Sequence, residues 1–164
     1  MERPAIEVAV VLQREAAPNR WEDWRFRITE VLPNEAAFGT APRQLHDDGK
    51  LTRWLYPGLR VELFADEGKG YFLNLSSGRP VWFVLWRIDQ ADPSSARPEA
   101  VTLSYNEAAR WMDNAEEQVD SLELPAEVAE WLQAFTDEHY RPVVEARRRP
   151  QSFVHPSERG KPRR

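Results

Sequence analysis

Residues with the types and spacing that catalysis or metal binding needs are scarce in this sequence. The chain of 164 residues has no cysteine and three histidines, which excludes disulfides, thiolate nucleophiles and iron–sulfur ligation. His46 is followed by Asp47 and Asp48, but neighbouring loop residues rarely converge on one metal ion, so a solvated polar loop is favoured. Adjacent acids also occur at 66–67 and 116–117, in turn-like segments where carboxylates are mostly exposed. We therefore predict a protein that is not an enzyme, with no catalytic residue, no metal and no cofactor.

The glycines do not form a phosphate-binding loop. None of the seven glycines lies in a strand, glycine-rich turn and helix unit, which excludes both a P-loop and a dinucleotide fingerprint. The nearest approach is Gly68-Lys69-Gly70. This segment lies between two apolar stretches, and we predict that it forms a hairpin turn.

Seven tryptophans are the most unusual feature of the composition, because tryptophan is enriched in cores and at binding hot spots. Trp82 and Trp86 are four residues apart in a predicted strand, so they share one face. Core packing against Trp111 and Trp131, one in each of two predicted helices, is favoured over a binding role for this pair. Trp21 lies at a turn edge among charged residues, where an interface anchor and a half-buried lid on the core are equally good interpretations.

The net charge of −5 combines two unlike segments. Residues 141–164 contain eight basic and two acidic residues, or +6, so residues 1–140 carry −11. The C-terminal segment is also rich in proline and poor in apolar residues, which predicts a tail that is disordered at least from Pro150 onward. The predicted organisation is one α+β domain at 1–140 followed by a basic tail at 141–164.

Three arginines of this tail are candidate binding residues: Arg147, Arg148 and Arg149. For the tail we favour a solubilising role over contact with an acidic protein surface. Nucleic acid ranks below both, because the domain that precedes the tail is acidic rather than basic.

No segment of the sequence predicts export or membrane insertion. The start, Met1–Pro4, lacks a basic region followed by an apolar stretch and a cleavage site. The longest apolar run, Val81–Trp86, falls far short of the roughly 20 residues that span a bilayer. A cytoplasmic location and no membrane contact are therefore expected.

Alternating apolar residues predict a strand-rich chain. Trp24–Leu32 alternates as a half-buried antiparallel strand does, and Val81–Ile88 is apolar on both faces, which places it centrally in a sheet. We predict a long loop at Pro33–Lys50 and a turn at Pro57-Gly58 between two strands. Tyr71–Leu75 is predicted to be the return strand of a hairpin.

Two helices are predicted after these strands, with a short strand at Gln118–Leu124 between them. Ser104 and Glu107 have the spacing of a capping box at the start of the first helix. Pro125 begins the second helix, which ends near Tyr140. These elements predict an α+β fold, a mostly antiparallel β-meander sheet of about six strands covered by two C-terminal helices.

Several short motifs follow the pattern of one known family. They are Val10–Glu15, Trp21–Arg25, Trp54–Gly58, Glu62-Leu63, Gly70–Leu75, Val101–Asp113, Glu117–Asp120, Leu124-Pro125, Trp131-Leu132, Phe135 and His139-Tyr140. Over about residues 6–140 the sequence thereby resembles a bacterial group, the domain-of-unknown-function 3305 family. The resemblance implies no established activity. It implies genes near the accessory and maturation genes of molybdenum-dependent formate dehydrogenases.

The first functional hypothesis is a non-enzymatic accessory or adaptor protein that assists maturation or assembly of such a formate dehydrogenase. Its partner would be another protein, a dehydrogenase subunit or maturation factor, and the sequence does not determine its oligomeric state. Arg14 and Glu15 end one predicted strand while Trp21 and Trp24 begin the next, so a hairpin would bring them together. The candidate partner- or ligand-binding residues are Arg14, Glu15, Trp21, Trp24, Tyr71 and Asn74.

The second hypothesis is a small-ligand or molybdenum-cofactor-handling protein. Its pocket would lie between the sheet and the helices, lined by Tyr71, Trp82 and Trp111. Asn74 would supply a polar anchor in that pocket.

Overall fold

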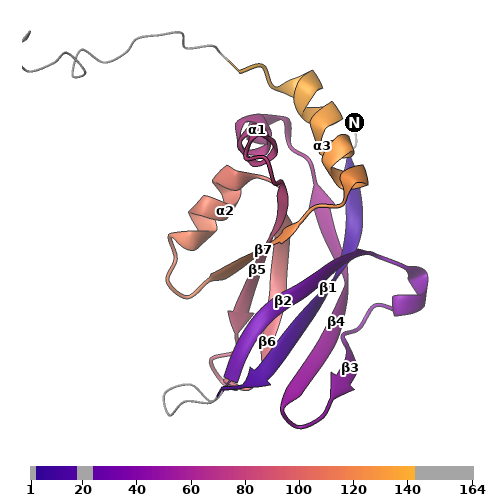
Figure 1. Cartoon of the computed structure of the whole chain (residues 1–164), viewed down its shortest axis with the longest axis vertical. Coiled ribbons are helices and arrows are strands. Elements are labelled where there is room, and N and C mark those ends of the chain that lie inside the picture. The colour runs from indigo at the N-terminus through magenta and orange to yellow at the C-terminus, as the bar shows by residue number, and fades with distance from the viewer. Residues whose placement is uncertain (1–2, 18–23, 143–164) are drawn as a thin grey trace, which may run out of the picture.

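The computed structural model describes residues 3–17 and 24–142, which form two antiparallel β-sheets and three α-helices (Figure 1). The strands are β1 (Ala5–Ala16), β2 (Trp24–Pro33), β3 (Arg43–Asp47), β4 (Leu51–Glu62), β5 (Val81–Ile88), β6 (Ala96–Thr102) and β7 (Gln118–Glu123). The helices are α1 (Gly68–Ser76), α2 (Tyr105–Met112) and α3 (Ala126–His139). The predicted α+β fold with antiparallel strands and two C-terminal helices is confirmed.

Each sheet is built from one continuous part of the chain. The four-stranded sheet has the order β2-β1-β4-β3 and the three-stranded sheet the order β6-β5-β7. The central strands of each sheet carry the longest apolar runs, at Val8–Leu12 in β1 and Val81–Trp86 in β5, as strands buried on both faces do. The central position of Val81–Ile88 is confirmed, although the strands divide into two sheets instead of one meander.

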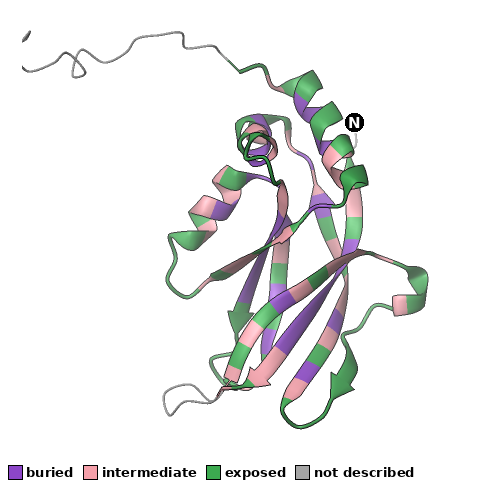
Figure 2. Cartoon of the chain, in the orientation of Figure 1, coloured by how far each residue is buried: buried purple, intermediate pink, exposed green. Residues whose placement is uncertain are grey.

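The main core lies where the inner faces of the two sheets meet. Figure 2 shows that buried residues concentrate on the central strands β1 and β5. Alternate residues of these strands share the core, with Val8, Val10 and Leu12 from β1 and Trp82, Val84 and Trp86 from β5. Trp131 of α3 packs against this core, whereas Trp111 is half-buried on α2 outside it. The predicted core role of Trp82 and Trp86 is therefore confirmed, with the other sheet as their main partner.

The two sheets also meet at their edges. The Tyr56 hydroxyl on β4 donates a hydrogen bond of 3.0 Å to the carbonyl oxygen of Ala96 on β6. At the opposite edge, the backbone N–H of Ile28 on β2 donates to the Asp120 carboxylate on β7 at 2.8 Å. These contacts fix how far apart the two sheet edges lie.

The segment predicted as a return strand, Tyr71–Leu75, is instead part of helix α1. A short 3₁₀ turn at Ala65–Glu67 leads directly into this helix, so the hairpin turn predicted at Gly68-Lys69-Gly70 is also wrong. The prediction failed because a short apolar run fits a strand and a helix equally well. Tyr71 and Asn74, three residues apart, lie on the buried side of α1.

Two further loop and turn predictions are corrected. The segment 33–50 is not one loop, because it contains a 3₁₀ turn at Ala36–Phe38 and the strand β3. All residues of β3 are exposed, so no alternation marks it as a strand. Pro57-Gly58 does not separate two strands, because both residues lie inside β4 where the pairing register with β1 shifts. Gly58 has a φ of 79° at this irregularity, a conformation that glycine adopts without strain.

The C-terminal elements agree with their predictions, apart from one detail of the helix cap. Ser104 Oγ accepts a hydrogen bond from the Glu107 N–H at 3.1 Å, but the Ser104 N–H donates to Thr102 Oγ1 and not to Glu107. The short strand β7 and the helix α3 lie where the sequence predicts them. No helix in the described part of the chain is long and apolar enough to cross a membrane.

Candidate binding cleft

The guanidinium group of Arg14 lies between two tryptophan side chains at one end of β1. Its Cζ atom is 4.1 Å from the centre of the Trp24 ring and 5.0 Å from that of Trp54. Both distances are those of cation–π contacts. Nη1 of Arg14 also donates to the carbonyl oxygen of Ser94 at 2.6 Å, across to the loop between β5 and β6. Arg14 thus links the end of the β1–β2 pair to the other sheet.

Three of the predicted site residues are brought together as expected. In the β1–β2 ladder Glu15 is opposite Arg25, and Ala16 is opposite Trp24, so Arg14, Glu15 and Trp24 lie at the same end of the pair. Glu15 accepts a hydrogen bond of 2.5 Å from the side-chain amide of Gln13, which is only 1% exposed. Arg14, Glu15 and Trp24 therefore lie together at one end of the β1–β2 pair, as the sequence predicted for these three residues.

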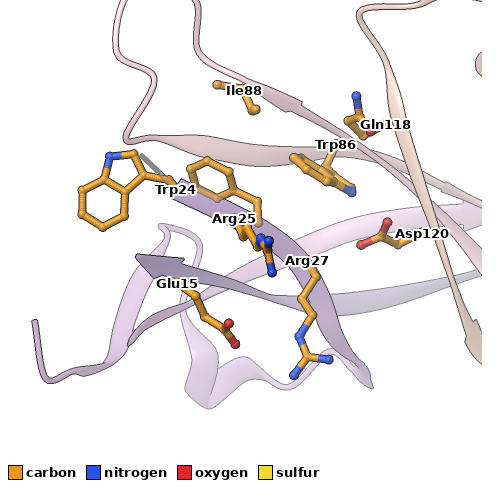
Figure 3. A pocket seen from close by; sticks show the side chains of 9 residues that line it. Glu15, Trp24, Arg25, Arg27, Trp86, Ile88, Gln118 and Asp120 are labelled. Carbon is orange, nitrogen blue, oxygen red and sulfur yellow. The ribbon is translucent and has the colours of Figure 1, made fainter. Parts of the chain in front are cut away.

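An open cleft of about 720 Å³ lies beside this cluster, between the edge of β2 and the strands β5 and β7 (Figure 3). Its lining residues are Glu15, Trp24, Arg25, Phe26, Arg27, Trp86, Ile88, Gln118 and Asp120. We call this the β2–β7 cleft. It contains two of the predicted residues, Glu15 and Trp24, on its β1–β2 side.

The aromatic wall of the β2–β7 cleft contains an unused hydrogen-bond donor. Trp86 is 6% exposed, and its indole Nε1 has no hydrogen-bond partner within the described ranges. Its ring lies 6.0 Å from that of Phe26, centre to centre. A buried donor without a partner costs about 1–3 kcal/mol. This donor is itself buried, so an acceptor reaches it only when the side chains around it move.

The edge of β2 along the β2–β7 cleft carries free backbone groups. The N–H of Ile28 points away from β1, since it donates to Asp120. In an antiparallel ladder every second residue of a strand presents its N–H and C=O to the same side. The pairing of residues 24–28 with β1 is regular, so Phe26 presents its N–H and C=O to the open side as well.

Charged side chains line the β2–β7 cleft where it borders the outer face of β2. Arg25 and Arg27 alternate there with the inward-facing residues, and Figure 3 shows the Arg27 side chain extending below the strand. Arg27 has no hydrogen bond or ion pair to any residue of 3–17 or 24–142. The two acids of the cleft accept hydrogen bonds from uncharged groups, Glu15 from the Gln13 side chain and Asp120 from the Ile28 N–H. The lining thus contains two acids and two arginines, and Arg27 is the arginine without an ion-pair partner among residues 3–17 and 24–142.

Tyr71 and Asn74, the other predicted site residues, lie inside the fold and away from the Arg14 cluster. The Asn74 side chain, 2% exposed, donates to the carbonyl oxygens of Val81 and Leu103, both at 2.9 Å, and accepts from the Val81 N–H at 3.0 Å. The Tyr71 hydroxyl accepts a hydrogen bond from the Phe64 N–H at 2.9 Å. Burial raises the pKa of Tyr71 to about 12, so this hydroxyl is neutral at physiological pH. Both side chains hold α1 in place.

The aromatic pocket of the second hypothesis is not assembled. Tyr71 packs edge-on against Phe135 of α3 at 5.9 Å between ring centres. Trp82 instead lines a separate groove of about 450 Å³ with Trp131, between the far ends of β1 and β2 and the start of α3. Trp111 lines neither this groove nor the β2–β7 cleft.

Some predictions lie outside the described residues. These are Trp21 and most of the basic tail, including Arg147, Arg148 and Arg149. His46, near the end of β3, and Asp48, in the exposed β3–β4 turn, approach to 3.4 Å between Nε2 and Oδ2. Within residues 3–17 and 24–142 no group of three or more histidine, aspartate and glutamate residues could hold a metal ion.

The sequence reasoning missed the opposite wall of the cleft. Trp86, Gln118 and Asp120 come from strands far along the chain from β2, and no local pattern connects them. Phe26 and Arg27 could have been found, because the alternation of β2 already placed one inward and the other outward. The position of β2 at the edge of its sheet could not be predicted, because it depends on which strands pair.

Comparison with known proteins identifies a family. The chain matches one family model, described as protein of unknown function DUF3305, over residues 7–149. No curated protein and no solved structure matches the chain. The matched region takes in every described strand and helix except the first two residues of β1. The resemblance expected from the motifs is therefore confirmed, and the chain belongs to DUF3305, a family of proteins of unknown function.

Proposed function

We propose that this chain is an adaptor protein that binds a segment of another protein in the β2–β7 cleft. One observation carries the proposal: a single cleft combines aromatic walls, the buried N–H of Trp86 and the cation of Arg27, and neither of these two groups has a partner in the described part of the chain. Tryptophan and arginine are the residue types most enriched where protein partners bind tightly. A cleft that only binds a segment of another protein needs no catalytic side chain.

The family supplies the first partner to test. The resemblance described above implies genes near those for accessory and maturation proteins of molybdenum-dependent formate dehydrogenases. We therefore propose that the partner is a subunit or maturation factor of such an enzyme, bound in a bacterial cytoplasm. The role would be to assist maturation or assembly without catalysing a reaction.

Affinity capture with a charge-reversal variant tests this function. The tagged full chain is expressed in its native host and crosslinked, and the captured proteins are identified by mass spectrometry. Arg27→Glu should lower recovery of a dehydrogenase subunit or maturation factor at least tenfold, because it reverses the unpaired charge of the cleft. Arg43→Glu is the matched control, since Arg43 is also an exposed arginine and lies on β3, at the other edge of the same sheet.

The outcomes separate clearly. Capture by the native chain and the Arg43→Glu variant, with loss in the Arg27→Glu variant, supports an adaptor that uses this cleft. Capture that is equal for all three chains shows a partner bound elsewhere. If no dehydrogenase subunit or maturation factor is captured by the native chain, the proposed partner is wrong.

A further inference from the structure

We infer that the partner segment binds in the β2–β7 cleft as an added β-strand along the free edge of β2. This inference rests on the proposed adaptor function and adds the mode of binding and the chemistry of the segment. The segment is an extended peptide in which apolar side chains alternate with acidic ones.

The free backbone groups of β2 set the mode of binding. The Ile28 N–H is taken by Asp120, but Phe26, two residues earlier, presents its N–H and C=O to the same open side. A strand edge of this kind pairs with any extended chain that reaches it. Peptides that add to a sheet edge gain their affinity from such backbone hydrogen bonds.

The two sheets meet beside β2 at one end of the cleft and diverge in strand length at the other. The Asp120–Ile28 hydrogen bond closes one end, where the edges of β2 and β7 meet. β7 begins at Gln118, opposite Trp86 in the β5–β7 ladder, while β5 continues beyond it to Ile88. Toward Trp24, β2 therefore has no β7 strand beside it.

The walls of the cleft set the side chains of the segment. The rings of Phe26 and Trp86 face the inner side of the sheet, so the side chains of an added strand on that side should be apolar. Arg27 lies on the outer side of β2, where an acidic side chain of the added strand would neutralise its charge. Side chains of a strand alternate between the two faces, which yields the alternating apolar and acidic pattern.

The unpaired indole of Trp86 supplies one more contact. Its Nε1 is a donor only, and because this atom is buried in the free chain the indole must turn toward the added strand before it can donate. A carbonyl oxygen of the segment would accept this hydrogen bond. Trp86 thus distinguishes a peptide from a purely apolar ligand, which has no acceptor to offer.

Selection of random dodecapeptides displayed on phage, with the full chain as bait, tests the inference. The selected peptides should show the alternating apolar and acidic pattern. Their affinity should fall about tenfold for Trp86→Phe, which keeps an aromatic ring but removes the donor.

A matched pair of variants at Phe26 separates strand addition from simple contact with the ring. Phe26→Ala removes the ring and keeps the N–H, whereas Phe26→Pro removes both. Proline is tolerated on an edge strand when its nitrogen faces away from the neighbouring strand, as the Phe26 nitrogen does. Strand addition predicts that the proline variant binds selected peptides at least tenfold more weakly than the alanine variant.

Peptide variants give the same test if Phe26→Pro fails to fold. A selected peptide is made in two forms, each N-methylated at every second amide. Only the set of amides that faces β2 should matter, so one form should lose binding to the native chain and the other should keep it. Amide exchange at Phe26 should be fast in the free chain and slow in the complex.

Several results would overturn the inference. They are the absence of selected peptides, equal binding by the Phe26→Pro and Phe26→Ala variants, and equal loss for both N-methylated forms. If a dehydrogenase subunit is still captured in the experiment above, the adaptor function stands and strand addition alone fails. If peptides bind as added strands but no such subunit is captured, the binding mode stands and the proposed partner fails.

Discussion

The Asp120 carboxylate on β7 accepts a hydrogen bond of 2.8 Å from the backbone N–H of Ile28 on β2. Ile28 is buried, and its N–H faces away from β1, so the carboxylate takes the place that a neighbouring strand would otherwise fill. One side chain thereby closes one end of the β2–β7 cleft and joins the edges of the two sheets.

Removing this carboxylate should destabilise the fold. Asp120→Ala leaves the Ile28 N–H without an acceptor, which costs about 1–3 kcal/mol in the free energy of unfolding. Asp120→Asn keeps an acceptor oxygen and should cost less. Urea unfolding measures both values. Asp113→Ala is the control, because Asp113 is exposed at the end of α2, and a loss as large as that of Asp120→Ala would contradict this explanation.

Gly70 should not tolerate a larger side chain. A Cβ atom at this position would clash with Ser104 Oγ and lie 3.0 Å from Ser104 Cβ and 3.2 Å from the backbone nitrogen of Asn106. Ser104 cannot move freely, because its hydroxyl donates to Glu67 at 2.5 Å and caps α2. Gly70→Ala should therefore destabilise the chain by about 1–3 kcal/mol in thermal or urea unfolding, despite the better helix propensity of alanine.

The neighbouring residue provides the control for Gly70. Lys69→Ala changes an exposed position of the same helix and should stay within about 0.5 kcal/mol of the native chain. The combination of Gly70→Ala with Ser104→Gly should recover part of the loss, since it removes the clashing atoms. Additive losses in this double mutant would show that the clash is not the cause.

Asn74 should be among the most sensitive polar residues of the fold. Its amide makes three hydrogen bonds to backbone groups of Val81 and Leu103, and so joins α1 to the start of β5 and the end of β6. Asn74→Ala leaves these backbone groups of Val81 and Leu103 buried without their hydrogen-bond partner. The expected loss is about 3 kcal/mol in the free energy of unfolding. Ser76→Ala serves as the comparison, because the Ser76 hydroxyl bonds only to its own helix at an exposed site.

The Asp48 carboxyl should titrate well below the usual range of aspartate. The backbone N–H groups of Leu51 and Lys50 donate to Oδ1 at 2.8 and 2.9 Å, and with the weaker contact to His46 they lower the pKa of Asp48 from 3.8 to about 2. Because the folded pKa is the lower one, the charged carboxylate stabilises the β3–β4 turn above pH 3.8, and this is lost as the pH falls through about 2.

An NMR titration of the Asp48 carboxyl carbon measures this pKa directly. His46→Ala should leave most of the shift in place, since the two backbone donors are its larger causes. A pKa near 3.8 in the native chain, or a complete return to 3.8 in the His46→Ala variant, would contradict the assignment of the shift to the backbone.

The sequence alone was sufficient to predict features that depend on residues close together in the chain. Apolar runs identified the central strands, and the short connection between β1 and β2 placed Arg14, Glu15 and Trp24 at one end of that pair. The pattern was not sufficient for Tyr71 and Asn74. Their apolar surroundings fit a strand or a helix, and only the packing of α1 against its neighbours decides between the two.

The other wall of the β2–β7 cleft could not be predicted, because it depends on contacts between distant segments. Asp120 lies 92 residues from Ile28, its hydrogen-bond partner, and nothing in either local sequence specifies that pairing. The same holds for Trp86, whose position in the core was predicted while its unpaired Nε1 was not. A donor is recognised as unused only when all surrounding acceptors are known.

The division of the chain into two consecutive sheets has a consequence for synthesis. All strands of the four-stranded sheet lie within residues 5–62, so its hydrogen-bond ladder can form while the rest of the chain is still being translated. The inner face of β1, with Val10 and Leu12, stays uncovered until β5 leaves the ribosome. During that interval the nascent chain exposes an apolar surface that attracts chaperones, and translational pausing before residue 81 would lengthen its exposure to aggregation.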